Sequence, residues 1–252
     1  MIRPVFEPET LPVIATGADL PPVAGARLTP DALRARFERQ LAWTPEKIAD
    51  APWRNPELDP RVAAVLVPLV IRERGLTVLL TQRADHLNDH AGQVSFPGGR
   101  QEPFDADATA TALREAREEV GLDASRVEVL GALPDYLTGT GFCVSPVIAL
   151  VHPPFSLEID TLEVAEVFEV PLAFLMDPAN HEERLFRYEG GERRFFAMPY
   201  PRGESTVTSE AAGQHGAQDT QTVRPAATQD GHHFIWGATA AMLRNLYRFL
   251  AA

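Results

Sequence analysis

The stretch that decides the fold is SFPGGRQEPFDADATATALREAREEVGL, residues 95–122. Pro97 and the two glycines after it interrupt a strand-like run, because proline lacks an amide donor and glycine adopts backbone shapes that other residues avoid. Asp105 or Asp107 can then cap a helix, and Gly121 can end it in the left-handed conformation. We therefore predict a glycine loop, an acidic connector and a helix.

The predicted helix has a packing face and an acidic face. At about 100° per residue, one side carries small and apolar side chains: Thr109, Leu113, Ala116 and Val120. Glu115, Glu118 and Glu119 lie on nearly the opposite side at i, i+3, i+4 spacing, so three like charges repel one another. Arg114 can pair with Glu118 one turn on, but negative charge stays in excess beside the negative end of the helix dipole.

This crowd of carboxylates indicates a divalent cation. Magnesium prefers hard oxygen ligands and keeps waters for substrate phosphates. We expect Mg²⁺ or Mn²⁺ on Glu115, Glu118 and Glu119, with a backbone carbonyl from Gly98 or Gly99 completing the shell. The alternative is a solvated charged helix face, which the letters REAREE alone would favour.

The same residues resemble the signature of Nudix hydrolases, which reads Gly, five residues, Glu, seven residues, then Arg-Glu-hydrophobic-x-Glu-Glu-x-Gly-hydrophobic. Residues 114–122 match every fixed position of its second half. The first half departs, because counting back from Arg114 puts Ala106 where the isolated Glu belongs, and counting forward from Gly99 puts Asp105 there. One residue has been inserted.

That insertion gives FPGGxxxPxD followed by TALREAxEEVGL, which resembles the coenzyme A pyrophosphatase branch of the family. LLTQRADHLNDHAGQVSFPGG, residues 79–99, is similar to that branch's extra signature, with Arg83, His90, Gly92 and Gln93 at matching places. The resemblance implies an α/β/α sandwich with a mixed sheet. It also implies cleavage of coenzyme A into 4′-phosphopantetheine and adenosine 3′,5′-bisphosphate.

Within this reading, Glu118 and Glu119 are the main metal ligands, Glu115 shares the metal or polarises water, and Arg114 orients the carboxylates. Arg83 could clamp phosphates with charge-assisted hydrogen bonds, or form an ordinary surface ion pair. The same two alternatives hold for Arg100.

Further candidates come from other segments. We expect His90 to order the loop rather than to contact the substrate. The same two alternatives hold for Gln93. Glu163, Glu166 and Glu169 lie where Nudix enzymes often place an extra carboxylate, and Glu166 is our choice as catalytic base. Tyr136 and the turn beginning at Thr138 could line the substrate pocket, although an aromatic packed inward would look the same.

Composition narrows the remaining function classes. The net charge is −12, with 35 acidic against 23 basic residues, which argues against general binding to nucleic acid or to membrane surfaces. Cys143 is the sole cysteine, so no intrachain disulfide or cysteine zinc site is expected. No apolar run approaches 18 residues, and we expect a cytoplasmic enzyme acting on a small molecule, with a homodimer left open.

We expect one globular domain over 61–252, preceded by an extension over 1–60 that contains one short helix starting at Thr29 and Pro30. The region 202–231 lacks large apolar side chains, so we predict a flexible insertion. Strands are expected at 61–72, 76–82, 127–133 and 144–151, a strand followed by a short helix at 164–177, and a closing helix at 236–250.

Two other functions stay open. The chain could hydrolyse another nucleoside diphosphate derivative, such as a dinucleotide, a nucleotide sugar or a damaged nucleotide, because specificity in such a fold comes from loops outside the helix. It could also be a binding module that has lost its chemistry, which the intact glutamates at 115, 118 and 119 speak against.

Overall fold

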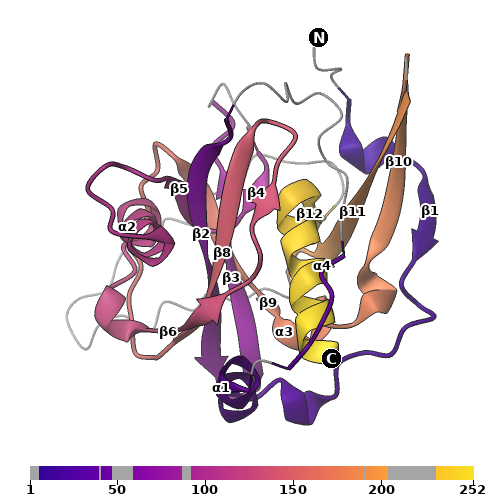
Figure 1. Cartoon of the computed structure of the whole chain (residues 1–252). Helices are drawn as coiled ribbons and strands as arrows, with labels where there is room; N and C mark the ends of the chain where they lie inside the picture. Colours follow the sequence, from indigo (N-terminus) through magenta and orange to yellow (C-terminus); the bar gives the residue numbers. More distant parts are fainter. Residues whose placement is uncertain (1–5, 40, 47–58, 87–91, 190, 204–230) are drawn as a thin grey trace.

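The computed structural model describes residues 6–39, 41–46, 59–86, 92–189, 191–203 and 231–252. A mixed β-sheet forms the centre of the molecule, with one helix on each face (Figure 1). His90 and nearly all of the predicted insertion at 202–231 lie outside the described residues, so the expectations for them stay predictions.

The mixed sheet contains eight described strands. They are β2 (Arg61–Arg72), β3 (Gly75–Arg83), β4 (Val94–Ser95), β5 (Gly98–Arg100), β6 (Val127–Ala132), β7 (Tyr136–Leu137), β8 (Phe142–Val151) and β9 (Val164–Pro171). Their order is β4-β3-β2-β8-β6, while β5 pairs with β2, β7 with β8 and β9 with β3. The long β2 and β8 run parallel from Arg61 and Phe142 onward, and the other described pairs are antiparallel.

Helices α2 (Ala108–Val120) and α4 (Gly237–Ala251) cover opposite faces of this sheet (Figure 1). Because successive side chains of a strand point to opposite faces of the sheet, one strand can contribute to the contact with α2 on one face and with α4 on the other. Ala64 and Val147 pack with Ala116 of α2, whereas Leu69 and Ile148 belong to the cluster that contains the buried side of α4. The expected α/β/α arrangement is confirmed.

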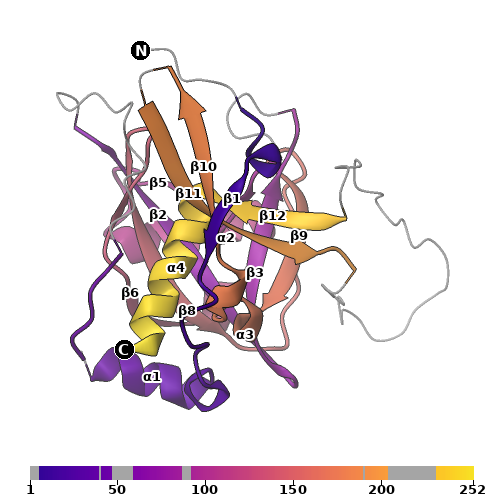
Figure 2. The ribbon, with the colours of Figure 1, turned by 90° about the vertical axis from the view of Figure 1, so that its right-hand side faces the viewer.

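A second, antiparallel sheet was not predicted. It consists of β1 (Val13–Thr16), β10 (Glu182–Tyr188), β11 (Gly191–Pro201) and β12 (His232–Trp236), in that order. Figures 1 and 2 show α4 between the mixed sheet and β10–β11. The strand β12 leads directly into α4, so the second sheet fixes where that helix begins.

The N-terminal segment packs against α4. The predicted short helix is α1 (Pro30–Glu38), whose first turn is capped by Thr29 Oγ1 accepting from Ala32 N at 3.3 Å. Leu33 is fully buried in the cluster that contains α4, and Arg36 Nε donates to Phe249 O at 2.8 Å. The division into an extension and a domain stays a prediction, but the two share one core.

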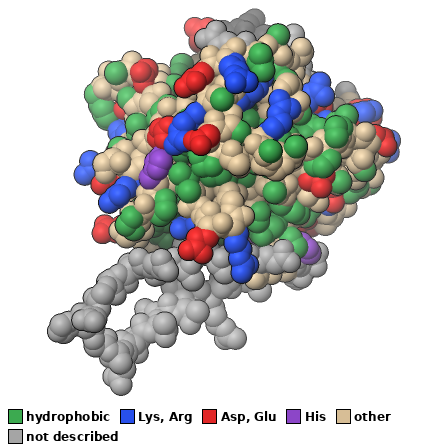
Figure 3. Space-filling view, turned by 90° about the horizontal axis from the view of Figure 1, so that it is seen from below, with side chains coloured by type: hydrophobic (Ala, Val, Ile, Leu, Met, Phe, Trp, Pro, Cys, Tyr) green, Lys and Arg blue, Asp and Glu red, His purple; other side chains and the backbone are tan. Residues whose placement is uncertain are grey.

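Shorter elements complete the chain: η1 (Pro8–Thr10), η2 (Gly25–Arg27), η3 (Ala124–Arg126), α3 (Leu172–Leu175) and η4 (Pro178–Asn180). None of the described helices is both long and apolar enough to cross a bilayer. On the face seen in Figure 3, acidic and basic side chains of the described residues are interspersed rather than gathered into one field.

Candidate active site

The helix α2 starts and stops where the sequence predicts. Asp107 is the N-cap, accepting from Ala110 N at 2.8 Å, and Gly121 ends the helix at φ 69°, in the left-handed region. The small side chain of Ala116 allows the helix to lie close to β2 and β5, so that the next residues on its other face reach the end of β5.

Two glutamates of α2 are held against the glycine pair. Glu119 is 5% exposed, and its Oε2 accepts from Gly98 N at 3.2 Å. Glu115 packs directly on Gly99, where a Cβ atom would overlap its carboxylate. Only glycine permits this approach, which explains the residue type at 99.

Burial and mutual repulsion disfavour the charged forms of both groups. Desolvation raises the pKa of Glu119 to about 8, with the charges of Glu115 and Glu163 adding to the effect and Arg83, at 4.0 Å, opposing it. Desolvation also raises the pKa of Glu115, with Glu118 and Glu163 adding to the shift. A cation between these groups would relieve both costs.

Arg114 organises the remaining carboxylates. Its Nη1 donates to Glu115 Oε1 at 2.9 Å and to Glu118 Oε2 at 2.8 Å. Its Nε and Nη2 donate to the two carboxylate oxygens of Asp105 at 3.0 and 2.9 Å. The side chain of Asp105 is 3% exposed, and this bidentate pairing lowers its pKa well below the usual range. Asp105, at the place of the isolated signature glutamate counted forward from Gly99, thus anchors the arginine that orients the site.

The donor set fits a hard divalent cation. Glu115, Glu118 and Glu119 offer only oxygen atoms, and burial raises the pKa values of Glu115 and Glu119, so a cation would favour their charged forms. In the described part of the chain no three acidic, His or Cys side chains are already grouped as metal ligands. Arg114 bonds to one oxygen each of Glu115 and Glu118, so the second oxygen of each carboxylate can serve as a ligand.

A cavity of about 340 Å³ lies next to the carboxylates, on the other side of β5. Its lining includes Val65, Val144, Trp236 and Gly237, the last at the start of α4. Its size is that of a small-molecule site. The described residues that line it include three arginines, at 83, 100 and 193, and none that is acidic. The cavity suits an anionic ligand with an apolar part.

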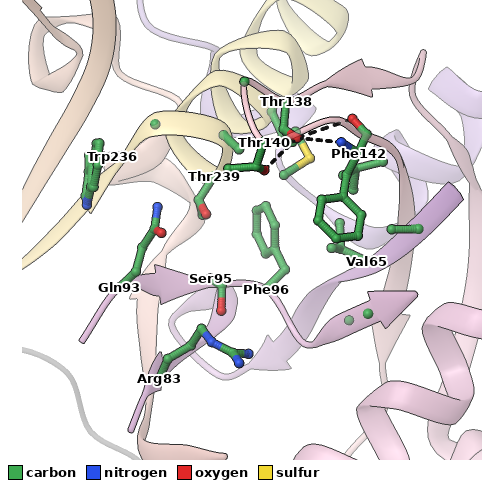
Figure 4. A pocket seen from close by; sticks show the side chains of 18 of the residues that line it. Val65, Arg83, Gln93, Ser95, Phe96, Thr138, Thr140, Phe142, Trp236 and Thr239 are labelled. Carbon is green, nitrogen blue, oxygen red and sulfur yellow. Dashed lines mark hydrogen bonds between the residues drawn. The ribbon is translucent and has the colours of Figure 1, made fainter. Parts of the chain in front are cut away.

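Four predicted substrate residues line this cavity: Arg83, Gln93, Arg100 and Thr138. Figure 4 shows Arg83 and Gln93 on one side and Thr138 on the other, with Phe96 between them. Thr138 also builds the turn, since its Oγ1 accepts from Phe142 N at 2.9 Å.

Tyr136 is a correction to the predicted site. Its ring is 7% exposed, belongs to the core cluster on the α4 face and does not line the cavity. Burial raises the pKa of its hydroxyl well above the usual range. The inward-packed alternative is the one that the structure shows.

Glu166 is a second correction, because the structure does not bring it to the carboxylates of α2. It pairs with Arg202 at 2.9 Å and His233 at 3.0 Å, on the face that carries Phe168 and the second sheet. Burial opposes its ionisation, but these two partners outweigh that effect and lower its pKa. Glu163, just before β9, is instead the residue of this segment whose charge acts on Glu115 and Glu119.

Sequence reasoning also missed the wall of the cavity formed by Arg193 and Trp236. Both belong to the second sheet, and no local pattern connects them with the glycine loop. For Glu163 a signal existed, since the sequence had already singled out three glutamates in this segment. Glu163 lies just before β9, whereas Glu166 and Glu169 are paired with β3 within it.

A profile described as NUDIX domain matches residues 60–186, which include β2, β3, the glycine pair and α2. The chain belongs to the Nudix family. A relative named uncharacterized Nudix hydrolase NudL, from Enterobacter sp. (strain 638), is 36% identical over 190 residues, covering 75% of this chain and 82% of the relative.

A relative of the same name from Photorhabdus laumondii subsp. laumondii is 33% identical over 211 residues, covering 84% and 92% of the two chains. Among solved structures, a Nudix hydrolase from M. smegmatis, RenU, is 24% identical, covers 46% of this chain and 73% of that one, and has a TM-score of 0.39. The Nudix family comprises hydrolases of nucleoside diphosphate derivatives that generally use divalent metal ions, and this chain is a Nudix hydrolase acting on small molecules.

Proposed function

We propose that this Nudix hydrolase cleaves the diphosphate of coenzyme A or its derivatives into 4′-phosphopantetheine and adenosine 3′,5′-bisphosphate. The observation that carries the proposal is the position of the segment resembling the coenzyme A branch. Arg83, Gln93, Ser95 and Phe96 form one wall of the cavity, and the same strand end brings Arg83 within 4.0 Å of Glu119. The segment whose sequence suggests coenzyme A as the substrate thus lies beside the glutamates that suggest metal-dependent hydrolysis.

Glu115, Glu118 and Glu119 would hold Mg²⁺ or Mn²⁺, with the carbonyl of Gly99 as a further ligand. When bound, the metal polarises the diphosphate and acidifies an attacking water. Arg114, anchored by Asp105, would orient Glu115 and Glu118 through its bonds to one oxygen of each.

Arg83 and Arg100 grip the non-reacting phosphate oxygens with charge-assisted hydrogen bonds. Gln93 and Thr138 offer polar atoms to the group that occupies the cavity. Glu163 replaces Glu166 as the proposed base: it takes the proton of the water that attacks phosphorus, and the other phosphate leaves with the bridging oxygen.

The test is to incubate the pure protein with Mg²⁺ or Mn²⁺ and a set of diphosphates, and to identify the products by mass. Phosphopantetheine from coenzyme A is the expected product. If the protein cleaves a dinucleotide, a nucleotide sugar or a damaged nucleotide instead, coenzyme A is not its substrate, but diphosphate hydrolysis remains its reaction. A protein inert to all of them would be a Nudix-fold binding module.

A further inference from the structure

A polar cluster connects the two sheets beside Arg83. Its members are Gln82 on β3, Glu166 on β9, Arg202 just after β11 and His233 on β12. We propose that Glu166 is a positioning residue, which keeps Arg83 oriented toward the diphosphate through Arg202 and Gln82. The proposal rests on the function proposed above, in which Arg83 holds phosphate.

Arg202 is the centre of the cluster. Its Nη1 donates to Glu166 Oε2 at 2.9 Å and its Nη2 to Gln82 Oε1 at 2.7 Å, so one guanidinium fixes two neighbouring strands. The other carboxylate oxygen of Glu166 accepts from His233 Nε2 at 3.0 Å. His233 is 2% exposed and stacks on Phe168 with ring centroids 3.6 Å apart, so this anchor has little freedom.

The cluster lies one peptide from Arg83. Gln82 is directly opposite Glu166 in the sheet, and the next pair, Arg83 and Val164, follows a register shift. Such a shift leaves the ladder locally irregular and re-aims the side chains next to it. Outside the cluster, the backbone of Arg83 is held by Gln93 O at 3.0 Å. A change in Gln82 is therefore transmitted directly to the residue that lies between the cavity and Glu119.

Glu169 provides a matched control on the same strand. It is 4% exposed and pairs with Arg72 at 2.5 Å, so it is also a carboxylate held by a guanidinium. Its register partner is Leu79, four residues before Arg83, and its odd spacing from Glu166 puts it on the opposite face of β9. Loss of its charge disturbs the sheet without touching Gln82.

The first test measures the affinity of the full-length protein for inorganic pyrophosphate with Mg²⁺ by calorimetry. We expect Arg83→Gln to weaken binding about tenfold and Glu166→Gln about fivefold. Because Glu166 acts through Arg83, the double variant should bind within about twofold of Arg83→Gln alone. Glu169→Gln should bind within about twofold of the unchanged protein, and its effect should multiply with that of Arg83→Gln.

The second test needs no ligand. Hydrogen exchange at the amides of Arg83 and Ala84, which bond to Gln93 O and Glu163 O, should speed up in Glu166→Gln but not in Glu169→Gln. Unchanged exchange, unchanged affinity in Glu166→Gln, or losses that multiply in the double variant would each overturn the positioning role.

The coenzyme A assay on the unchanged protein separates this inference from the proposed function. If pyrophosphate binds but coenzyme A is not cleaved, the proposed substrate fails, and the affinity comparison still decides about Glu166. A protein that binds no pyrophosphate overturns the positioning role as well, since Arg83 would then have no phosphate to hold.

Discussion

At the scale of single residues, Glu119 is the most buried of the three proposed metal ligands. Glu119→Gln keeps an oxygen for Gly98 N but removes the charge that a cation needs. We expect a folded protein whose rate is about a thousandfold lower, equivalent to about 4 kcal/mol of transition-state stabilisation. The measurement is kcat on coenzyme A, with the exposed Glu73→Gln as a control within about twofold. Retention of more than about a tenth of the rate would contradict the assignment.

Gly99 makes a second residue-scale prediction. In Gly99→Ala the new methyl group would overlap the carboxylate of Glu115, which must then move away from the end of β5. We expect at least a tenfold loss of kcat, about 1.4 kcal/mol, with the fold intact. Gly25→Ala is the matched control, because a Cβ atom there meets nothing within 4 Å. Equal activity of the two variants would show that the position of Glu115 is unimportant.

The sequence predicted those site residues whose proximity is local. Spacing along one helix puts Glu115 and Glu119 on one face whatever the rest of the chain does. It could not place Glu166, because the partners of this side chain, Arg202 and His233, are distant along the chain. Nor could it place Tyr136, since its alternation fits both an inward and a cavity-facing ring.

At the scale of elements, α2 and the loop between β8 and β9 act together. Two amides of this loop cap the helix end, Glu158 N donating to Val120 O at 2.9 Å and Asp160 N to Glu119 O at 3.0 Å. The loop continues to Glu163, so a ligand held by the helix also orders the segment that carries the proposed base.

Metal binding should therefore stabilise the protein measurably. At a Mg²⁺ concentration 100 times Kd, the gain in unfolding free energy is about 2.7 kcal/mol. We expect differential scanning calorimetry to show a rise in Tm with added Mg²⁺, reversed by a chelator. Glu119→Gln should show little of this rise. An equal rise in both proteins would locate the bound ion elsewhere.

The elements that the sequence predicted are those with a strong local period. β2, β3, β6, β8, β9, α1, α2 and α4 all lie where the apolar pattern indicated. In the second sheet, β10 and β11 are consecutive strands that pair as a hairpin, so a local signal existed for them. β1 could not be found, because its partner is distant: Val13 pairs with Arg184 of β10, and all four residues of β1 are exposed. A strand with no buried face leaves no alternation to find.

At the scale of the whole molecule, the N-terminal segment and the Nudix domain share a core. Leu33→Ala should therefore lower the unfolding free energy by about 3 kcal/mol, because it leaves a cavity in the core under α4. The control is Leu41→Ala, at a side chain that is 47% exposed, which should cost less than about 0.5 kcal/mol. Urea unfolding measures both. A small effect of Leu33→Ala would mean that the segment packs loosely.

His181 directly precedes β10 and connects α3 with α4. It is fully buried, donates from Nε2 to Leu175 O at 2.7 Å and accepts at Nδ1 from Arg244 Nη1 at 3.2 Å. Protonation of Nδ1 would break the hydrogen bond from Arg244 and place the positively charged imidazolium beside the Arg244 guanidinium. Burial, assisted by the charge of Arg244, lowers the pKa of His181 from 6.5 to about 4.

A lowered histidine pKa makes stability depend on pH with a definite sign. Between pH 6.5 and 4, His181 is protonated in the unfolded chain but stays neutral in the folded one. The contribution of His181 to the unfolding free energy is therefore complete above pH 6.5 and is lost as the pH falls toward 4. The loss amounts to roughly 3 kcal/mol.

Other groups titrate as well, and the raised pKa of Glu119 acts with the opposite slope, so the informative quantity is a difference between proteins. His181→Gln can keep the bond to Leu175 O but cannot gain a proton. Its unfolding free energy in urea should lie below that of the unchanged protein at pH 7.5, and the gap should close or reverse by pH 4.5. A constant difference for His181→Gln would mean that this imidazole does not couple folding to pH.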